Sequence, residues 1–421
     1  MILDLIFTIL KKFSLKSSNQ SINTSINLVS SKSESNRALI INALEGFRCE
    51  LKNISAARDT QTMKALLNSS DYVADVLDAG TTMRFLTSYF AITGQNKMLT
   101  GTARMCERPI GILVDSLRLL GAEIEYAKIE GYPPLILKGF HYSGITELKI
   151  RGDVSSQFIS SILMVAPKLP NGLTVKLIGE VGSKPYIEMT IAQMRLFGCK
   201  VDVDWKLNTI KVSNQLYNAS KYVVESDWSG ASYWYSVVAL ANEAEIKLFG
   251  LKENSLQGDS AIVGIMEKLG VASTFTADGV ILKKIPHQSN IEQDFSQCPD
   301  LCQTISVICA AKGIDAIFTG IESLKVKETD RVLAIQNELK KFGADLVEIE
   351  TNLSYKLIPS ATMGQSKSAV EVETYDDHRM AMAFAPLCLI QPIIISHPEV
   401  VAKSYPSFWE DFRKVAAIKE L

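Results

Sequence analysis

The chain has 421 residues, of which 47% are hydrophobic and 21% are charged, and its formal net charge at pH 7 is −2. This near-neutral balance excludes a basic coat for nucleic acid, and the length favours two or more folding units in a soluble globular protein. Seven cysteines form no C-x-x-C pair and four histidines show no ligand spacing. We therefore expect a reduced, cytoplasmic protein without a structural metal or a cofactor.

The opening run, residues 1–10, is apolar around Asp4 and is followed by Lys11 and Lys12. It is too short to span a bilayer and lacks a small-residue cleavage pattern. We interpret this run as a buried first strand and expect no membrane segment.

The motif S-K-S-E-S-N-R occupies residues 31–37, directly before the apolar run 38–44. Serine is a preferred residue at a helix start, so this pattern predicts a helix that begins here. Its free backbone N–H groups can converge on an anion together with Lys32, Ser33 and Arg37. A serine-capped helix with a solvated lysine is the alternative interpretation.

Two further motifs of the first half carry arginines. D-A-G-T-T-M-R at 78–84 places Gly80 in a tight turn before a predicted helix, and the missing Cβ would let a ligand approach the backbone closely. A simple loop-to-helix turn explains the glycine as well. R-M-C-E-R-P at 104–109 supplies Arg104 and Arg108, whose guanidinium groups fit carboxylate or phosphate through two parallel hydrogen bonds.

Hydroxyl-rich helix starts are predicted at V-S-S-Q-F, residues 154–158, and at S-K-P-Y, residues 183–186. Neutral donors at such places can bind phosphate, although capping of the helix is their more ordinary role. In K-E-T-D-R at 327–331, Lys327 and Arg331 are four residues apart, which predicts that both lie on one helical face. Charge pairing along a solvated helix is the alternative.

The last two basic motifs lie near the end of the chain. D-D-H-R at 376–379 precedes the apolar run 380–387, so Arg379 is expected near the start of a buried helix. A cation at that end opposes the helix dipole, which favours a bound anion. A-K-S at 402–404 adds Lys403.

An internal repeat organises the chain. Amphipathic stretches end at Gly121, Gly198, Gly270 and Gly343, which are 77, 72 and 73 residues apart, and each glycine suits the left-handed position after a helix. An alternating or apolar run after each glycine predicts a strand. With two less regular copies, at 62–67 and 408–415, the pattern predicts about six units of about 70 residues. The alternative is that each glycine marks an ordinary connection from a helix to a strand, which explains one such junction more easily than four at near-constant spacing.

Taken in chain order, these motifs resemble those of the 5-enolpyruvylshikimate-3-phosphate (EPSP) synthase family over residues 25–415. The matching set is S-K-S-x-S-N-R, A-G-T-x-M-R, E-R-P-I, S-S-Q-F, S-K-P-Y, K-E-T-D-R and D-H-R-M. The resemblance implies an α/β, two-domain enolpyruvyl transferase fold, an inside-out α/β barrel with three βαβαββ repeats per domain. One domain would comprise residues 1–29 and 228–421 and the other residues 30–227, with chain crossings near 29–30 and 227 and the active site between them.

The resemblance also implies an activity. The enzyme would transfer the enolpyruvyl group of phosphoenolpyruvate (PEP) to the 5-hydroxyl of shikimate 3-phosphate and release phosphate. The reaction would pass through a tetrahedral intermediate by addition and elimination, on the route to chorismate and the aromatic amino acids. We expect these two small molecules as partners, no nucleic acid, no membrane, and a monomer.

Site residues follow from the resemblance, position by position. Shikimate 3-phosphate would be held by Lys32, Ser33, Arg37, Ser155, Ser156, Gln157, Ser183, Asp300 and Lys327. PEP would be held by Lys32, Gly80, Arg108, Gln157, Arg331, Arg379 and Lys403. The catalytic residues would be Asp300 as base for the hydroxyl, Glu328 as proton donor to carbon, and Lys32 as a further proton or charge partner.

The chain departs from the family pattern at three places. The usual Pro-Gly before S-K-S is Val29–Ser30, and the usual Asn before K-E-T-D-R is Ser323. The usual Asn before A-G-T is Asp78, which should repel PEP unless Arg108 or Lys32 neutralises it.

Two alternative functions are open. The sister family transfers enolpyruvyl to UDP-N-acetylglucosamine and uses a loop cysteine, but the flanks of Cys106 match the shikimate enzymes, so we interpret this cysteine as incidental. A non-catalytic, anion-binding scaffold is the alternative of a different class. The presence of Asp300, Glu328 and Lys32 argues against it.

Overall fold

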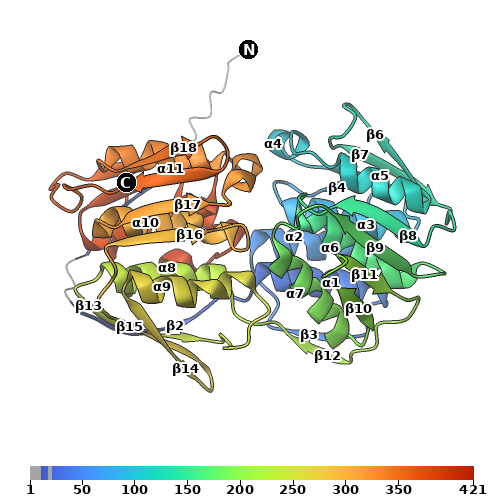
Figure 1. Ribbon diagram of the computed structural model, residues 1–421, viewed down its shortest axis with the longest axis horizontal. Helices are drawn as coiled ribbons and strands as arrows, with labels where there is room; N and C mark the ends of the chain where they lie inside the picture. Colours follow the sequence, from blue (N-terminus) through green and yellow to red (C-terminus); the bar gives the residue numbers. More distant parts are fainter. Residues whose placement is uncertain (1–10, 18–20) are drawn as a thin grey trace, which may run out of the picture.

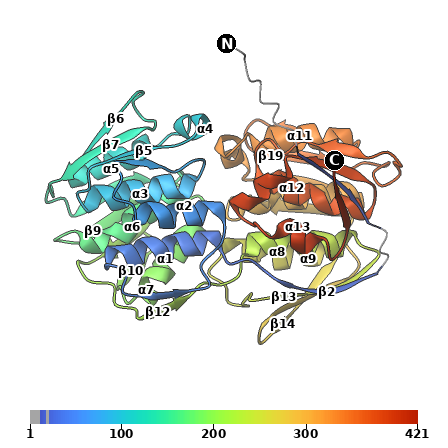
Figure 2. The ribbon, with the colours of Figure 1, turned by 180° about the vertical axis from the view of Figure 1, so that it is seen from behind.

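The computed structural model describes residues 11–17 and 21–421, so the strand predicted over residues 1–10 lies outside the described residues. Two separate hydrophobic cores divide the described chain into two lobes, which lie side by side in Figure 1 and, from behind, in Figure 2. The insert lobe has its core between Ala38 and Val224. The terminal lobe combines core residues of the segments 13–28 and 228–416.

Two complete βαβαββ units form much of the insert lobe. The first contains β4 (Val73–Asp75), α3 (Gly80–Ile92), β5 (Lys97–Thr100), α5 (Gly111–Leu120), β6 (Ala122–Tyr126) and β7 (Leu135–Phe140), with the short α4 (Ala103–Cys106) before α5. The second contains β8 (Glu147–Arg151), α6 (Ser156–Val165), β9 (Leu173–Ile178), α7 (Lys184–Leu196), β10 (Val201–Asp204) and β11 (Thr209–Val212). Their strand orders correspond, β4-β5-β7-β6 and β8-β9-β11-β10, with a parallel first pair and antiparallel later pairs.

The remaining part of the insert lobe is assembled from its two ends. Its first residues form α1 (Lys32–Leu44), β3 (Glu50–Lys52) and α2 (Arg58–Leu67), and its last strand is β12 (Lys221–Val223). Strands β3 and β12 pair in parallel, with Tyr222 opposite Leu51. The pair β3–β12 can therefore form only after the whole insert lobe has been synthesised.

The terminal lobe contains three units, two of which use strands from the N-terminal segment. The first is β2 (Ser21–Asn27), α8 (Trp228–Leu240), β13 (Glu243–Phe249), α9 (Ile262–Leu269), β14 (Val271–Thr276) and β15 (Gly279–Lys284). The second is β16 (Asn290–Asp294), α10 (Cys302–Lys312), β17 (Asp315–Thr319), α11 (Arg331–Lys341), β18 (Asp345–Glu350) and β19 (Ser354–Ile358). The third is β20 (Val370–Val372), α12 (His378–Phe384), β21 (Ile393–Ser396), α13 (Phe408–Phe412), β22 (Ala417–Glu420) and β1 (Lys12–Lys16). Strand β1 lies between β21 and β22 and is antiparallel to both.

Short 3₁₀ helices lie in several connections of both lobes. They are η1 (Ala166–Lys168), η2 (Gly258–Ala261), η3 (Pro299–Leu301), η4 (Glu322–Val326), η5 (Ala385–Leu389) and η6 (Pro398–Lys403). In the described part of the chain, no helix has both the length and the apolar character that crossing a membrane requires.

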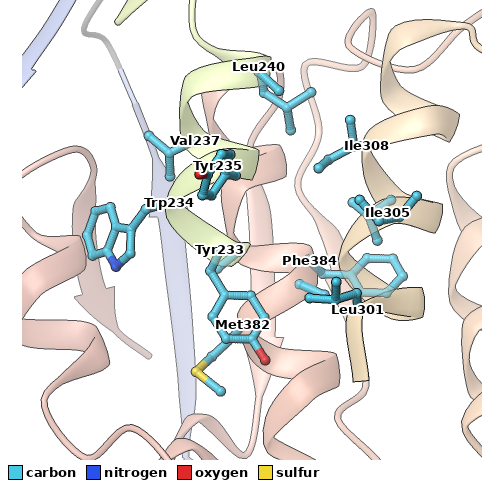
Figure 3. Packing of buried hydrophobic residues seen from close by; sticks show 14 of the residues in the cluster. Tyr233, Trp234, Tyr235, Val237, Leu240, Leu301, Ile305, Ile308, Met382 and Phe384 are labelled. Carbon is cyan, nitrogen blue, oxygen red and sulfur yellow. The ribbon is translucent and has the colours of Figure 1, made fainter. Parts of the chain in front are cut away.

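Helices occupy the centre of each lobe and the sheets surround them (Figures 1 and 2). Almost every residue of α3, α6, α8 and α12 is buried, as expected for helices that are apolar on all sides. Figure 3 shows Tyr233 and Val237 of α8 in the same core as Ile305 of α10 and Phe384 of α12. This arrangement leaves the first residues of the central helices at the boundary between the lobes.

The glycine repeat is confirmed by the backbone. Gly121, Gly198, Gly270 and Gly343 all have positive φ, at 108, 87, 100 and 78°. Each follows a helix and precedes a strand, namely β6, β10, β14 and β18. The less regular copies correspond to α2 and α13.

The two connections between the lobes run together. Ser30 and Ser226 form an antiparallel bridge, the N–H of Ser31 donates to the Glu225 carbonyl (2.8 Å), and the N–H of Asp227 donates to the Val29 carbonyl (2.8 Å). These contacts form a two-stranded crossing ribbon, residues 29–31 with 225–227.

We expect Gly121→Ala to destabilise the protein more than Gly94→Ala, although both glycines have positive φ (108 and 67°). A Cβ at Gly94 has no neighbour within 4 Å, so only the backbone strain of about 1–2 kcal/mol applies. A Cβ at Gly121 would overlap the backbone carbonyl of His141, adding about 1–3 kcal/mol. Thermal or urea unfolding of both variants measures the difference, and equal losses would contradict the steric explanation.

Candidate active site

A cavity of about 810 Å³ lies between the two lobes and is lined by both. Seven α-helices of the two lobes bring residues of their first turns to it: α1, α3, α5, α6, α7, α11 and α12. The unpaired N–H groups of a helix start carry partial positive charge, so the backbone alone favours an anion here. Within the described residues, no group of three or more histidine, cysteine or acidic side chains is arranged to hold a metal ion.

Most of the residues predicted for the site line this cavity. They are Lys32, Ser33, Arg37, Gly80, Arg108, Ser155, Ser156, Gln157, Ser183, Asp300, Lys327, Glu328, Arg331 and Arg379. Lys403 does not line it. The structure thus brings basic motifs from chain positions almost 350 residues apart to one space.

The start of α1 places two basic side chains at the cavity. Ser31 caps the helix by accepting a hydrogen bond from the N–H of Glu34 (3.4 Å), so the predicted helix start is confirmed. The ammonium of Lys32 pairs with Asp59 of α2 (3.0 Å). Arg37 donates to Thr190 of α7 (2.7 Å) and to the Ser33 carbonyl (2.9 Å). Arg37 therefore fixes α1 against α7 while its charge borders the cavity.

Gly80 makes room for an arginine. The predicted helix is present as α3, but Gly80 is its first residue and does not lie in a turn before it, and a Cβ on it would be 2.7 Å from Nη1 of Arg108. Arg84, one turn further, donates to the Pro109 carbonyl (3.1 Å). Burial and the neighbouring Arg108 lower the pKa of Arg84 to about 9. Two guanidinium groups therefore lie close together, which is favourable only beside negative charge.

Arg331 is the centre of the terminal-lobe wall. Its buried guanidinium contacts three carboxylates: Asp377 (2.7 Å), Glu328 (2.9 Å) and Asp300 (3.0 Å). Asp300 also pairs with Arg379 (2.8 Å). This network fixes the orientation of both guanidinium groups and of the two carboxylates at the cavity surface.

Asp300 and Glu328, the two carboxylates at the cavity surface, are ionised. Burial would raise the pKa of Asp300, but Arg379 and Lys327 outweigh it and hold the pKa below its ordinary value. Burial is likewise outweighed at Glu328, where Arg331 and Lys403 lower the pKa well below its usual range. Both shifts depend on cations that a bound anion would neutralise.

A family model described as EPSP synthase (3-phosphoshikimate 1-carboxyvinyltransferase) matches residues 64–412. A Bacteroides fragilis protein named 3-phosphoshikimate 1-carboxyvinyltransferase is 45% identical over 403 residues, covering 95% of this chain and 97% of that protein. The chain belongs to the EPSP synthase family. A Haemophilus influenzae protein of the same name is 36% identical and covers 93% of this chain and 96% of its own length.

The fold implied by the resemblance is also confirmed. A solved structure of EPSP synthase from Acinetobacter baumannii superposes with a TM-score of 0.77 at 21% identity, covering 98% of this chain and 100% of that one. This member of the EPSP synthase family therefore has the two-domain enolpyruvyl transferase fold. The terminal lobe has three units, and the insert lobe has two complete units and a smaller part with the two strands β3 and β12.

Two local predictions for this EPSP synthase family member are wrong. Lys327 and Arg331 do not share a helical face, because Asp330 caps α11 and Lys327 lies before the helix in extended backbone. Ser183 does not cap α7, because its own φ is positive (49°) and its hydroxyl points to the Ser296 carbonyl (3.5 Å). Ser155, by contrast, caps α6 as expected.

The charge at Asp78 is neutralised by other residues than expected. Neither Arg108 nor Lys32 forms a described ion pair with it. Its carboxylate pairs with Lys403 of the terminal lobe (2.8 Å) and with Arg58 (3.0 Å). The partner could not be predicted from the sequence, because Lys403 lies 325 residues away.

Sequence reasoning missed four residues at or beside the cavity. Asp59 balances Lys32, and Tyr186 donates its hydroxyl to Asp300 (3.3 Å) across the lobe boundary. His378 lines the cavity, and burial with the nearby Lys32 lowers its pKa well below the ordinary value, so the ring is neutral. Tyr186 and His378 lie within the motifs S-K-P-Y and D-D-H-R, which was an available signal for both.

Asp259 of η2 is the fourth missed residue. Its Oδ2 accepts a hydrogen bond from the hydroxyl of Ser229, which in turn accepts one from Arg379 (3.5 Å). Its Oδ1 is buried and has no hydrogen-bond partner in the described structure. Burial and the neighbouring Asp300 raise the pKa of Asp259 to about 7. Asp259 therefore holds a proton up to a much higher pH than Asp300, which stays ionised.

We expect Asp259→Asn to alter the pH dependence of stability. A carboxyl whose pKa is about 7 when folded and about 4 when unfolded stabilises the fold at low pH, and this is lost as pH rises through 7. The Asn variant has no such titration. Its free energy of unfolding relative to the wild type should therefore increase between pH 5 and pH 8, by on the order of 2–4 kcal/mol.

Calorimetric unfolding at four pH values between 5 and 8 measures this change. Glu267→Gln, which removes an exposed carboxylate from α9 of the same lobe, is the control and should follow the wild-type curve. A constant difference between Asp259→Asn and the wild type over this range would exclude the raised pKa.

Proposed function

We infer that the protein transfers the enolpyruvyl group of PEP to the 5-hydroxyl of shikimate 3-phosphate and releases phosphate. The observation that carries this inference is one interlobe cavity that combines cations from both lobes with two ionised carboxylates. Both substrates are polyanions of a size that such a cavity can hold, and membership of the EPSP synthase family supports the same reaction.

The proposed ligand assignments divide the cavity wall. For shikimate 3-phosphate they are Lys32, Ser33, Arg37, Ser155, Ser156, Gln157, Ser183, Asp300 and Lys327. For PEP they are Lys32, Gly80, Arg108, Gln157, Arg331, Arg379 and Lys403. In support, hydroxyl groups and helix starts dominate the first set, whereas guanidinium groups from both lobes dominate the second. Planar, bidentate donors suit the carboxylate and phosphate of PEP.

Asp300 is proposed as the base that takes the proton of the 5-hydroxyl. It is ionised, and its contacts with Arg331 and Arg379 fix the direction of its lone pairs. Its low pKa makes it a weak base while these cations are unneutralised. Bound PEP would neutralise them, which would raise the pKa of Asp300 towards the range in which it accepts a proton.

Glu328 is proposed as the proton donor to the methylene carbon of PEP, and its pKa, like that of Asp300, would have to rise when substrate binds. Its carboxylate is ionised beside Arg331 and close to Lys403, so it cannot donate before these charges are engaged by substrate. Lys32, paired with Asp59, is a further proton or charge partner. The fixed cations would stabilise the charge that develops at the tetrahedral centre.

The domain boundaries are part of the proposal. We assign residues 1–29 and 228–421 to one domain and residues 30–227 to the other, supported by the two cores and by the crossing ribbon. A monomer is supported by the fact that one chain supplies both cavity walls. A cytoplasmic location is supported by seven cysteines, all of them free in the structure.

A turnover assay tests the function. Phosphate release should require PEP and shikimate 3-phosphate together, and UDP-N-acetylglucosamine should not replace the latter. Absence of turnover with shikimate 3-phosphate would reject the proposal. Turnover with the UDP sugar would favour the sister activity, and binding of both anions without phosphate release would favour the scaffold.

Asp300→Asn and Glu328→Gln should each lower kcat by about 10²–10⁴-fold, because each removes a group that exchanges a proton while retaining its shape. The matched control is Asp315→Asn, which alters an exposed carboxylate of β17 in the same lobe and should leave kcat unchanged. Steady-state kinetics measures kcat for each variant, and thermal unfolding checks that each variant is folded. Near-normal kcat in either variant would remove that residue from the mechanism.

A further inference from the structure

Lys403, a proposed PEP ligand, does not reach the cavity in the structure. It ends η6 in the terminal lobe, and its side chain is only 1% exposed. Its ammonium lies 2.8 Å from Oδ2 of Asp78 and 2.8 Å from the Asp78 backbone carbonyl. An ammonium has three N–H donors, so two of the three are engaged by one residue of the opposite lobe.

Asp78 is itself shared between two cations. Both of its carboxylate oxygens accept from Nη2 of Arg58 (3.0 Å each), and the Arg58 side chain is 45% exposed. Burial works against ionisation of Asp78, but Lys403 and Arg58 together lower its pKa below the ordinary value. A charged carboxylate therefore bridges a buried cation and a surface cation.

Two other carboxylates lie further from the same ammonium. Asp59 and Glu328 are each 3.7 Å from Nζ of Lys403, beyond direct hydrogen-bonding distance. Lys403 thus has acidic neighbours on the cavity side as well, and its position close to Asp78 is determined by the shorter contacts. Both Asp59 and Glu328 line the cavity, so a small rotation of the flexible lysine stem would bring its charge to the cavity surface.

We propose that Asp78 lowers the affinity for PEP by competing with it for the ammonium of Lys403. This inference rests on the proposed function. PEP gains the charge of Lys403 only by displacing an internal carboxylate, so one anion is exchanged for another and the net gain is reduced. Arg58 moderates this competition, because it withdraws part of the Asp78 charge from Lys403.

Asp78→Asn removes the competing charge and keeps the shape of the side chain. We expect the KM for PEP to fall roughly fivefold, the difference between a charge-assisted and a neutral hydrogen bond. The KM for shikimate 3-phosphate and kcat should change by less than about twofold, since the assigned contacts of that ligand do not include Lys403. Asp78→Glu retains the charge and should retain the wild-type KM for PEP.

Arg58→Gln should have the opposite effect. Without Arg58, the whole charge of Asp78 acts on Lys403, and the KM for PEP should rise about two- to threefold, the size of a weak exposed pair. In the Asp78→Asn background the same substitution should have no effect, because the carboxylate through which Arg58 acts is gone. Asp75→Asn, which changes an exposed carboxylate at the end of β4, three residues before Asp78, is the control for general charge and should leave the KM unchanged.

An unchanged or higher KM for PEP in Asp78→Asn would overturn the proposal, as would an equal effect of Arg58→Gln in both backgrounds. If Asp78→Asn does not yield folded protein, Arg58→Gln alone decides, and an unchanged KM there contradicts the proposal. Wild-type turnover with shikimate 3-phosphate is measured first, and its absence would reject the function and not the competition. Calorimetric titration of PEP into wild-type and Asp78→Asn protein then tests the competition without catalysis.

Discussion

Compensation of buried charge is the constraint on which this site depends. A guanidinium as buried as that of Arg331 remains favourable only where carboxylates replace the water that it has lost. Asp300, Glu328 and Asp377 provide this replacement from three different segments of the terminal lobe. The same contacts fix the guanidinium in one orientation, so the cavity offers preorganised charge and its cations need little rearrangement when an anion binds.

Charge compensation also connects the two lobes. Tyr186 contacts Asp300, Lys403 contacts Asp78, and Arg104 of α4 donates to the backbone carbonyl of Glu328 (3.3 Å). Each of these contacts crosses the boundary beside the cavity, while both covalent connections lie together in the crossing ribbon. An anion that enters the cavity therefore changes the balance of contacts that hold the lobes together.

Local chemistry explains which parts could be predicted from the sequence. Ser31 and Ser155 cap helices through their own hydroxyls, and Gly80 begins one, so these starts are properties of a few adjacent residues. The counter-charges could not be predicted in this way. Asp59 meets Lys32, and Asp377 meets Arg331, only after distant elements have packed. The start of α11 was misplaced for a local reason, because the charge spacing in K-E-T-D-R hid the cap formed by its own aspartate.

The position of β1 has a consequence for the order in which the molecule is made. This strand lies between β21 and β22, and the N–H of Leu421 donates to the carbonyl of Lys12 (2.9 Å). On the ribosome, its partners emerge only after the insert lobe and most of the terminal lobe have been synthesised. The insert lobe contains neither end of the described chain and can close its core earlier. Throughout that interval both edges of β1 are unpaired, so its sheet can form only after β21 and β22 have been synthesised.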